Sequence, residues 1–244
     1  MANPLTIFYA CDIHGSERVF RKFLKAAPFF GANAVFFGGD ITGKRLVPIV
    51  ERGPGRWRAE LFDKAYDVES GAGLDDLEGR IRANGFYPYR TTADEVAQMT
   101  ADPAYLAGAF GRVMAETAEH WVTMADEQLR AAGVPALMMP GNDDEPAVKR
   151  ILAQGSWIVD AEDRIVDLEG YQVASYGYST TTPWHSPREV TEEGMAAALK
   201  APESKRDGLH THRIRVFNAI WRDGWEDVPH RNEGNVWAFR RRVP

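Results

Sequence analysis

Three short motifs contain side chains that are suited to binding a divalent metal ion. They read Asp12-Ile13-His14, Gly39-Asp40 and Gly141-Asn142-Asp143. Carboxylate, imidazole and amide groups together suit a borderline ion such as Mn, Fe or Zn. Each motif alone has an ordinary structural explanation, because Asp, Asn and Gly are common in turns and at helix N-termini. Their co-occurrence, each after an apolar run, favours a shared metal site.

The apolar runs before the three motifs are typical of short buried strands. They cover Leu5–Cys11, Asn33–Phe37 and Pro135–Met139, and a helix is predicted over Glu17–Ala27 between the first two. A strand, helix and strand in this order predict a parallel pair with a right-handed crossover. Ligands of open α/β sheets bind outside the carboxyl ends of the strands. We therefore expect an α/β fold in which the three motifs meet at one edge of a sheet.

Residues 44–133 interrupt this alternation and predict a mainly helical insertion. The expected elements are a hairpin of Leu46–Val50 and Trp57–Phe62 and helices over Leu74–Ala83, Ala93–Met99 and Ala104–Ala132. The apolar residues of the last helix are spaced mostly three or four apart, as on a helix that packs against a core. The insertion either forms a cap that limits substrate size or simply extends the fold.

The alternation of strands and helices returns after the third motif. We expect helices over Ala147–Gln154 and Glu189–Lys200, and strands over Trp157–Val159, Arg164–Leu168 and Tyr171–Tyr176, the last two forming a hairpin. The tail, residues 202–244, is rich in Arg, Trp and His, and we expect little of it in a core. It is interpreted either as a basic interaction tail or as the result of a frame change or truncation.

The bulk composition narrows the class of protein. The single cysteine, Cys11, excludes an intrachain disulfide framework. A net charge of -6 argues against a nucleic-acid binder that works through basicity. We see no signal peptide and no apolar run long enough to span a membrane, so the sequence predicts a cytoplasmic protein. No Gly-x-Gly-x-x-Gly or Walker-type loop follows any strand, which argues against a nucleotide-binding domain.

The three motifs together resemble the first three sequence blocks of the calcineurin-like metallophosphoesterases. The resemblance covers roughly residues 5–180 without the insertion, and Thr181–Glu189, which reads TTPWHSPRE, also looks like an uncharacterised bacterial and archaeal branch of that family. It implies a metallophosphoesterase domain over residues 1–201. It further implies a β-sandwich with helices on both outer faces, four layers in the order αββα.

The resemblance also implies a role for each motif residue at a site with two divalent metal ions. Asp12 and His14 would bind one ion, Asp40 would bridge both, and Asn142 would bind the second ion and contact the phosphate. Such an ion pair activates water and stabilises an in-line displacement at phosphorus. The implied activity is hydrolysis of a small phosphomonoester or phosphodiester.

The chain departs from the family pattern at two places. Asp143 stands where the family has a histidine that protonates the leaving group, and a carboxylate is a poor general acid at neutral pH. We predict Asn142 and Asp143 as the catalytic residues and His185 as a weaker candidate for the acid. The late histidine blocks have only His210 and His212 as counterparts, with His230 weaker still. The alternative is therefore a catalytically impaired protein of the same fold that binds metal or phosphate.

Overall fold

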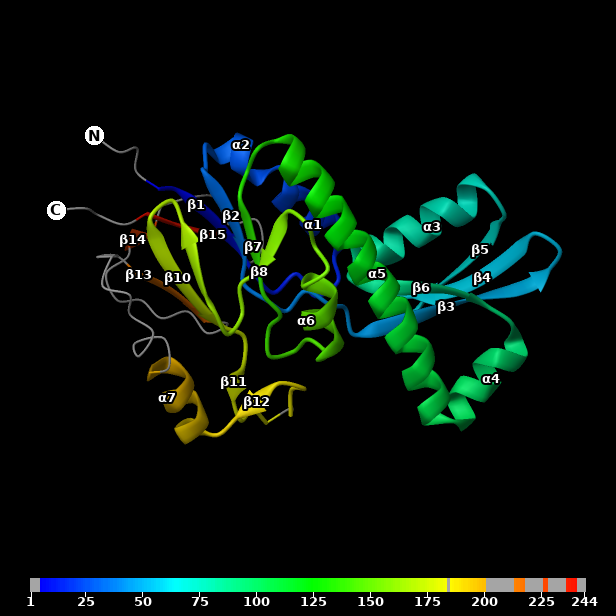
Figure 1. The fold of residues 1–244 in the computed structure, drawn as a ribbon. Coiled ribbons are helices and arrows are strands. Elements are labelled where there is room, and N and C mark those ends of the chain that lie inside the picture. The colour runs from blue at the N-terminus through cyan, green and yellow to red at the C-terminus, as the bar shows by residue number, and fades with distance from the viewer. Residues whose placement is uncertain (1–4, 184, 201–212, 218–225, 228–235, 241–244) are drawn as a thin grey trace. The chain divides into compact units, whose positions relative to one another are not determined.

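The computed structural model describes residues 5–183, 185–200, 213–217, 226–227 and 236–240 (Figure 1). The chain divides into two compact units. The first takes in Met1–Asp12, Lys22–Ile41 and Ala118–Pro244, and the second takes in Ile13–Arg21 and Thr42–Thr117. Both contain helices and strands, so the α/β prediction is confirmed.

The first unit is built on a six-stranded sheet with the order β14-β15-β1-β2-β7-β8 (Figure 1). Its central strands are β1 (Ile7–Ala10), β2 (Ala34–Phe37), β7 (Ala136–Met138) and β8 (Ile158–Asp160). Each of these four is parallel to the next, as the predicted crossover requires. The loops that carry the three motifs therefore leave the same edge of this sheet.

Helices cover one face of the six-stranded sheet. The sequence predicted one helix over Glu17–Ala27, but the chain forms α1 (Glu17–Leu24) and α2 (Ala26–Phe30). Pro28 explains the break, because proline has no amide hydrogen to donate to residue 24 and its ring crowds that carbonyl. Phe23 packs between the helices and the sheet, with its ring 5.1 Å from that of Phe37.

A second sheet packs on the opposite face, with the order β13-β10-β9. The predicted hairpin is confirmed as β9 (Ile165–Leu168) and β10 (Tyr171–Tyr176), which pair antiparallel. The core between the two sheets comprises Tyr9, Cys11, Ala34, Phe36, Leu137, Met139, Ala161, Leu168 and Val173. Two sheets thus stack face to face, with helices outside the larger one.

The tail contributes strands to both sheets. β13 (Arg213–Phe217) runs parallel to β10, β15 (Val236–Arg240) runs antiparallel to β1, and β14 (Glu226–Asp227) pairs with β15. The expectation that little of the tail lies in a core stays a prediction. Strand formation there depends on pairing with distant partners, which a local pattern reports poorly. His210, His212 and His230 lie outside the described residues.

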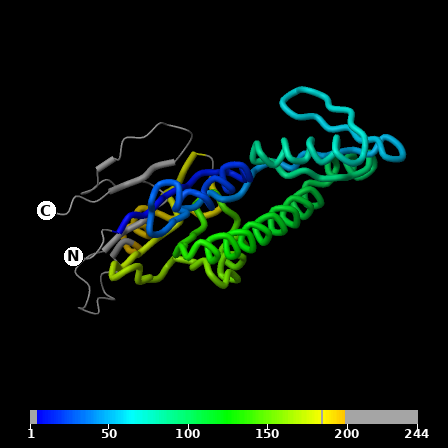
Figure 2. The backbone as a smooth tube through the Cα atoms, turned by 90° about the horizontal axis from the view of Figure 1, so that it is seen from above, coloured from blue at the N-terminus to red at the C-terminus, as the bar shows by residue number. Residues whose placement is uncertain are grey.

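The other elements of the first unit surround the sheets. Helix α6 (Ala147–Leu152) follows the third motif, and β11 (Ser179–Thr180) and β12 (Glu189–Val190) form a two-stranded sheet before α7 (Glu192–Lys200). The helix predicted over Glu189–Lys200 therefore begins later, after a short strand. Helix α5 (Pro103–Ala131), whose residues from Ala118 onward belong to this unit, lies within one residue of its predicted bounds and is continuous (Figure 2).

The second unit has its own sheet and core. The sheet order is β5-β4-β3-β6, with β3 (Arg45–Gly53), β4 (Arg56–Leu61), β5 (Lys64–Glu69) and β6 (Phe86–Thr91). Helices α3 (Ala72–Ala83) and α4 (Ala93–Ala101) were predicted, and Leu74, Leu77 and Ile81 of α3 pack on Val47 and Ile49. The predicted hairpin is β3 and β4, whereas β5 and β6 had no predicted structure. In the described part of the chain, no helix is long and apolar enough to cross a membrane.

Candidate metal centre

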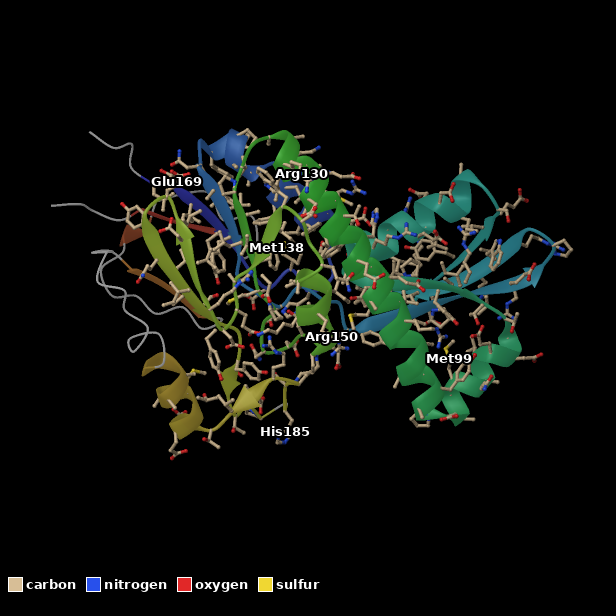
Figure 3. The ribbon with its side chains drawn as sticks, viewed as in Figure 1. Met99, Arg130, Met138, Arg150, Glu169 and His185 are labelled. Carbon is tan, nitrogen blue, oxygen red and sulfur yellow. The ribbon has the colours of Figure 1, made fainter. Side chains whose placement is uncertain are left out.

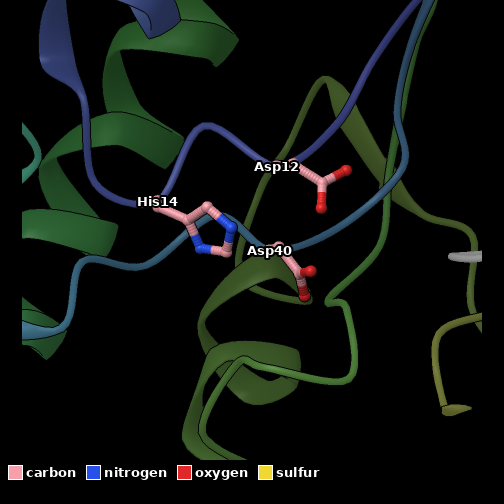
Figure 4. A group of neighbouring side chains, drawn as sticks. All are labelled: Asp12, His14 and Asp40. Atoms are coloured by element: carbon pink, nitrogen blue, oxygen red, sulfur yellow. The ribbon is translucent and has the colours of Figure 1, made fainter. Parts of the chain in front are cut away.

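The structure brings three of the four predicted metal ligands together. One ligand atom each of Asp12, His14 and Asp40 lies within 4.8 Å of the other two (Figure 4). Asp12 and His14 belong to the loop that follows β1, and Asp40 belongs to the loop that follows β2. Asp40 is buried, Asp12 is half-buried and His14 is exposed. Two carboxylates and an imidazole at this spacing can ligate one borderline divalent ion.

The backbone at this group is unusual. Asp12, His14 and Asp40 all have positive φ, at 55°, 43° and 54°. Residues other than glycine rarely adopt this left-handed region, and each such residue costs about 1–3 kcal/mol. The surrounding structure must over-determine these conformations to keep them. Positive φ also occurs in turns away from the site, for example at Phe62 and Asp63, so here it shows how tightly the loops bend after β1 and β2.

Glycines let the loop after β7 approach Asp40 closely. A Cβ atom on Gly141 would lie 2.0 Å from Asp40 Oδ1, and a Cβ atom on Gly39 would lie 2.5 Å from Gly141 Cα. No side chain can occupy either position without moving the backbone. Gly39 and Gly141 are therefore needed for the close approach of the loops that follow β2 and β7. This need is separate from the backbone freedom that glycine gives to a turn.

Asp144, which the sequence patterns did not single out, fixes this approach. It is fully buried, and its Oδ2 accepts hydrogen bonds from Gly141 N at 2.8 Å and Ile41 N at 3.1 Å. The carboxylate thus joins the loops that follow β2 and β7. The neighbouring Asp143 donates its backbone N–H to Asp40 Oδ1 at 3.0 Å. Such charge-assisted bonds hold the Asp40 carboxylate in place.

Asn142, the fourth predicted ligand, lies on the loop that follows β7, next to Gly141 and Asp143. It is half-buried, and its side-chain Nδ2 donates to Ser186 Oγ at 2.9 Å. The side chain of Asp143, the predicted general acid, is also half-buried. The catalytic roles of Asn142 and Asp143 stay predictions.

A buried ion pair supports the Gly141-Asn142 turn from outside. Arg188 donates from Nη1 to Gly141 O at 2.9 Å and from its backbone N to Asn142 O at 3.0 Å. Its Nη2 pairs with Glu162 Oε1, which also accepts from Gly177 N. Burial works to lower the pKa of Arg188, but the hydrogen bond and charge of Glu162 outweigh it, so that pKa is raised. Arg188 therefore stays charged and holds this turn.

Sequence reasoning missed this support. Arg188 lies in the segment that carried the family resemblance, but nothing in the pattern connects it with Glu162, 26 residues earlier. A buried charge needs a partner of opposite sign. The residue types therefore suggest that a buried arginine pairs with some carboxylate, but not with which one. The pairing becomes visible only when the fold is known.

His185 does not join the group of metal ligands. Its side chain is exposed and points away from the strands of the first unit (Figure 3). Its φ is 53°, so it occupies a tight bend of its loop. The structure therefore brings no support to its role as a general acid.

Comparisons with known proteins add little to this geometry. No protein-family model matches the chain, and no curated protein sequence matches it. One similar solved structure is TT1561 of Thermus thermophilus, which is 14% identical with a TM-score of 0.47, covering 96% of this chain and 72% of that one. Another is 11% identical with a TM-score of 0.44, covering 96% and 76% of the two chains. Both TM-scores are too low for us to base a fold or a function on them.

Proposed function

We propose that the chain is a metal-dependent phosphoesterase of the calcineurin-like type, which hydrolyses a small phosphomonoester or phosphodiester. The observation that carries this proposal is the grouping of Asp12, His14 and Asp40 within 4.8 Å, on loops from adjacent parallel strands. The stacked sheets with helices outside the larger one are compatible with the four-layer sandwich of that family. The resemblance of all three motifs to the calcineurin-like metallophosphoesterases then suggests the reaction, which is hydrolysis of a phosphate ester.

The donor set fits a divalent ion. Asp12 and His14 would hold the first ion, Asp40 would bridge to a second, and Asn142 would hold the second and contact the phosphate. Within the described residues, one group of three acidic or histidine ligands is present. When bound, divalent ions lower the pKa of water and offset the charge that develops on the phosphoryl oxygens.

The protein's own residues orient this chemistry. The Asp143 N–H holds one oxygen of Asp40, and the buried Asp144 keeps the loop of Asn142 against the loop of Asp40. An aspartate in place of a histidine at position 143 limits protonation of the leaving group, since a carboxylate is a poor general acid at neutral pH. We therefore expect esters with good leaving groups, or diesters, to be the better substrates.

The first experiment combines elemental analysis with hydrolysis. Purified chain is dialysed with Mn²⁺ and Zn²⁺, its metal content is measured, and it is assayed with bis(p-nitrophenyl) phosphate and p-nitrophenyl phosphate. Asp40→Asn should lose bound metal and at least about 100-fold in kcat/KM, because a bridging carboxylate serves both ions. Asparagine keeps the acceptor for the Asp143 N–H, so the melting temperature should change little.

Asp67→Asn is the matched control, because Asp67 is an exposed aspartate of the second unit whose partner is Arg58 at 3.4 Å. It should leave metal content and hydrolysis unchanged. A wild-type chain without metal, or full hydrolysis by Asp40→Asn, would contradict the proposal.

A second candidate function is favoured by Asp143, which replaces the expected acid. In this alternative the chain is a catalytically impaired metal- or phosphate-binding protein of the same fold. Bound metal without hydrolysis of either ester, together with binding of inorganic phosphate, would favour this alternative.

A further inference from the structure

The segment Thr181–Glu189 is attached to the turn that carries Asn142. Three hydrogen bonds join them: Asn142 Nδ2 to Ser186 Oγ, Arg188 N to Asn142 O, and Arg188 Nη1 to Gly141 O. The residues joined are more than 40 positions apart in sequence, so these contacts belong to the fold and not to a local turn. The segment thus holds both the backbone and the side chain of Asn142.

Ser186 is itself fixed in place. It is buried at 9% exposure, although its neighbours His185 and Pro187 are exposed. Its backbone N donates to Glu189 Oε1 at 2.7 Å, and the same oxygen accepts a hydrogen bond from Thr182 Oγ1. The hydroxyl of Ser186 is therefore presented to Asn142 from a closed loop.

We propose that Ser186 is a positioning residue that sets the orientation of the Asn142 amide for metal binding. An amide group has one side that donates and one that accepts, and only its carbonyl oxygen can ligate a cation. When Nδ2 donates to Ser186, Oδ1 is on the opposite side of the amide. The bond thus restrains the rotation of the Asn142 amide, with Oδ1 on the side away from Ser186, as outer-shell partners do for metal-ligating side chains. The inference rests on the proposed function, since it takes Asn142 as a metal ligand.

The backbone of this turn does not depend on Ser186. Arg188 holds the carbonyls of Gly141 and Asn142, and Asp144 holds the N–H of Gly141. Removing the Ser186 hydroxyl should leave the turn in place and release only the rotation of the amide. A weaker Mn²⁺ affinity in a variant without the Ser186 hydroxyl would then come from the freed Asn142 side chain and not from a loosened loop.

The test measures the Kd for Mn²⁺ by titration calorimetry on the full chain. Ser186→Ala should weaken Mn²⁺ binding about 10-fold, the lower end of effects seen for outer-shell partners, with an unchanged melting temperature. Ser186→Thr keeps a hydroxyl and should restore most of the affinity. Thr91→Val removes a similarly buried hydroxyl, which is bound to Glu95 in the second unit, and should not change the Kd.

A double-mutant cycle shows whether Ser186 acts through Asn142. In an Asn142→Ala background, Ser186→Ala should have no further effect on the Kd. An unchanged Kd in the single variant, or the same loss of about 10-fold in the Asn142→Ala background, would overturn the inference. If the wild-type chain binds no Mn²⁺, the proposed function fails and the inference falls with it. If the wild-type binds and Ser186→Ala binds equally well, only the inference fails.

Discussion

The turns around the candidate metal centre and the sheet of the second unit are held together in opposite ways. Asp144, Glu162 and Arg188 are charged and at most 3% exposed, and they bond to backbone groups of the site loops. In the second unit the core of the sheet is apolar, and the buried Glu78 pairs with Arg82 and Arg90, whose side chains are 41% and 50% exposed. The Arg58–Asp67 pair has side chains 48% and 69% exposed. Polar tethers fix the first region, whereas apolar burial fixes the second.

The difference indicates what each region is built for. Burying a charge is costly, and a buried ion pair adds little net stability over apolar residues of the same volume. What it adds is defined geometry, provided that every polar atom has a partner. The site loops accept this cost at the Glu162–Arg188 pair. Positive-φ residues do not distinguish the two regions, because Phe62 and Asp63 in the β4–β5 turn have them as well as the three ligand candidates. The comparison predicts that changes to polar groups will have large effects in the first region and small ones in the second.

The largest combined effect on stability and metal binding is expected from Arg188→Met. It leaves the buried Glu162 carboxylate with Lys149 Nζ, 3.0 Å from Oε2, as its remaining cation, so we expect a cost at the low end for a broken buried pair, about 3 kcal/mol. The free energy of unfolding, measured in urea, should fall by that amount, and Mn²⁺ binding should weaken because the Asn142 turn loses the bond that the guanidinium donates to Gly141 O. Arg58→Met breaks the exposed Arg58–Asp67 pair and should lower the free energy of unfolding by less than about 1 kcal/mol. Equal losses in the two variants would refute the contrast between buried and exposed pairs.

A change to the apolar core of the second unit should separate stability from metal binding. Leu77 is 1% exposed and belongs to the core of the second unit. Leu77→Ala should lower the free energy of unfolding by about 3 kcal/mol, through lost burial and the cavity left behind. The Kd for Mn²⁺, measured on the folded variant, should stay the same. A weakened Kd would show that the metal centre depends on the core of the second unit.

The sequence predicted those parts of the fold in which local pattern and final structure agree. The strands before the three motifs, the β9–β10 hairpin and helices α3 to α5 have strong apolar periodicity or clear turn signals. The sequence missed β5, β6 and strands of the tail, because strand formation depends on the pairing partners, which a local pattern does not report. It also missed the break at Lys25, where the effect of Pro28 on the preceding turn outweighs the helical pattern.

At the candidate site, sequence reasoning predicted the residue types but not their supports. Asp12, His14 and Asp40 were found because strand ends and motif spacing are local signals. Asp144, Ser186 and the Glu162–Arg188 pair act across 26 to 103 residues of sequence, and no local pattern encodes such a distance. From one sequence alone, these partners cannot be paired before the fold is known.

A smaller effect than those of Arg188→Met and Leu77→Ala is expected from Glu78→Gln in the second unit. Glu78 accepts hydrogen bonds from Arg90 and Arg82, whose side chains are about half exposed. Burial works to raise its pKa, but the two arginines outweigh burial, so the pKa lies below its usual 4.5. Because the folded pKa is lowered, the stabilisation is complete above pH 4.5 and is lost as the pH falls through the folded value.

We therefore expect Glu78→Gln to lower the free energy of unfolding by about 1 kcal/mol at neutral pH, since solvent screens the exposed arginines. The difference between variant and wild type should shrink steadily below pH 4.5. Urea denaturation of both chains at a series of pH values measures it. A difference that is constant with pH would mean that the carboxylate's charge contributes nothing and that only its shape or hydrogen bonding matters. A loss as large as that of Arg188→Met would mean that the polar groups of the second unit are as critical as those of the site.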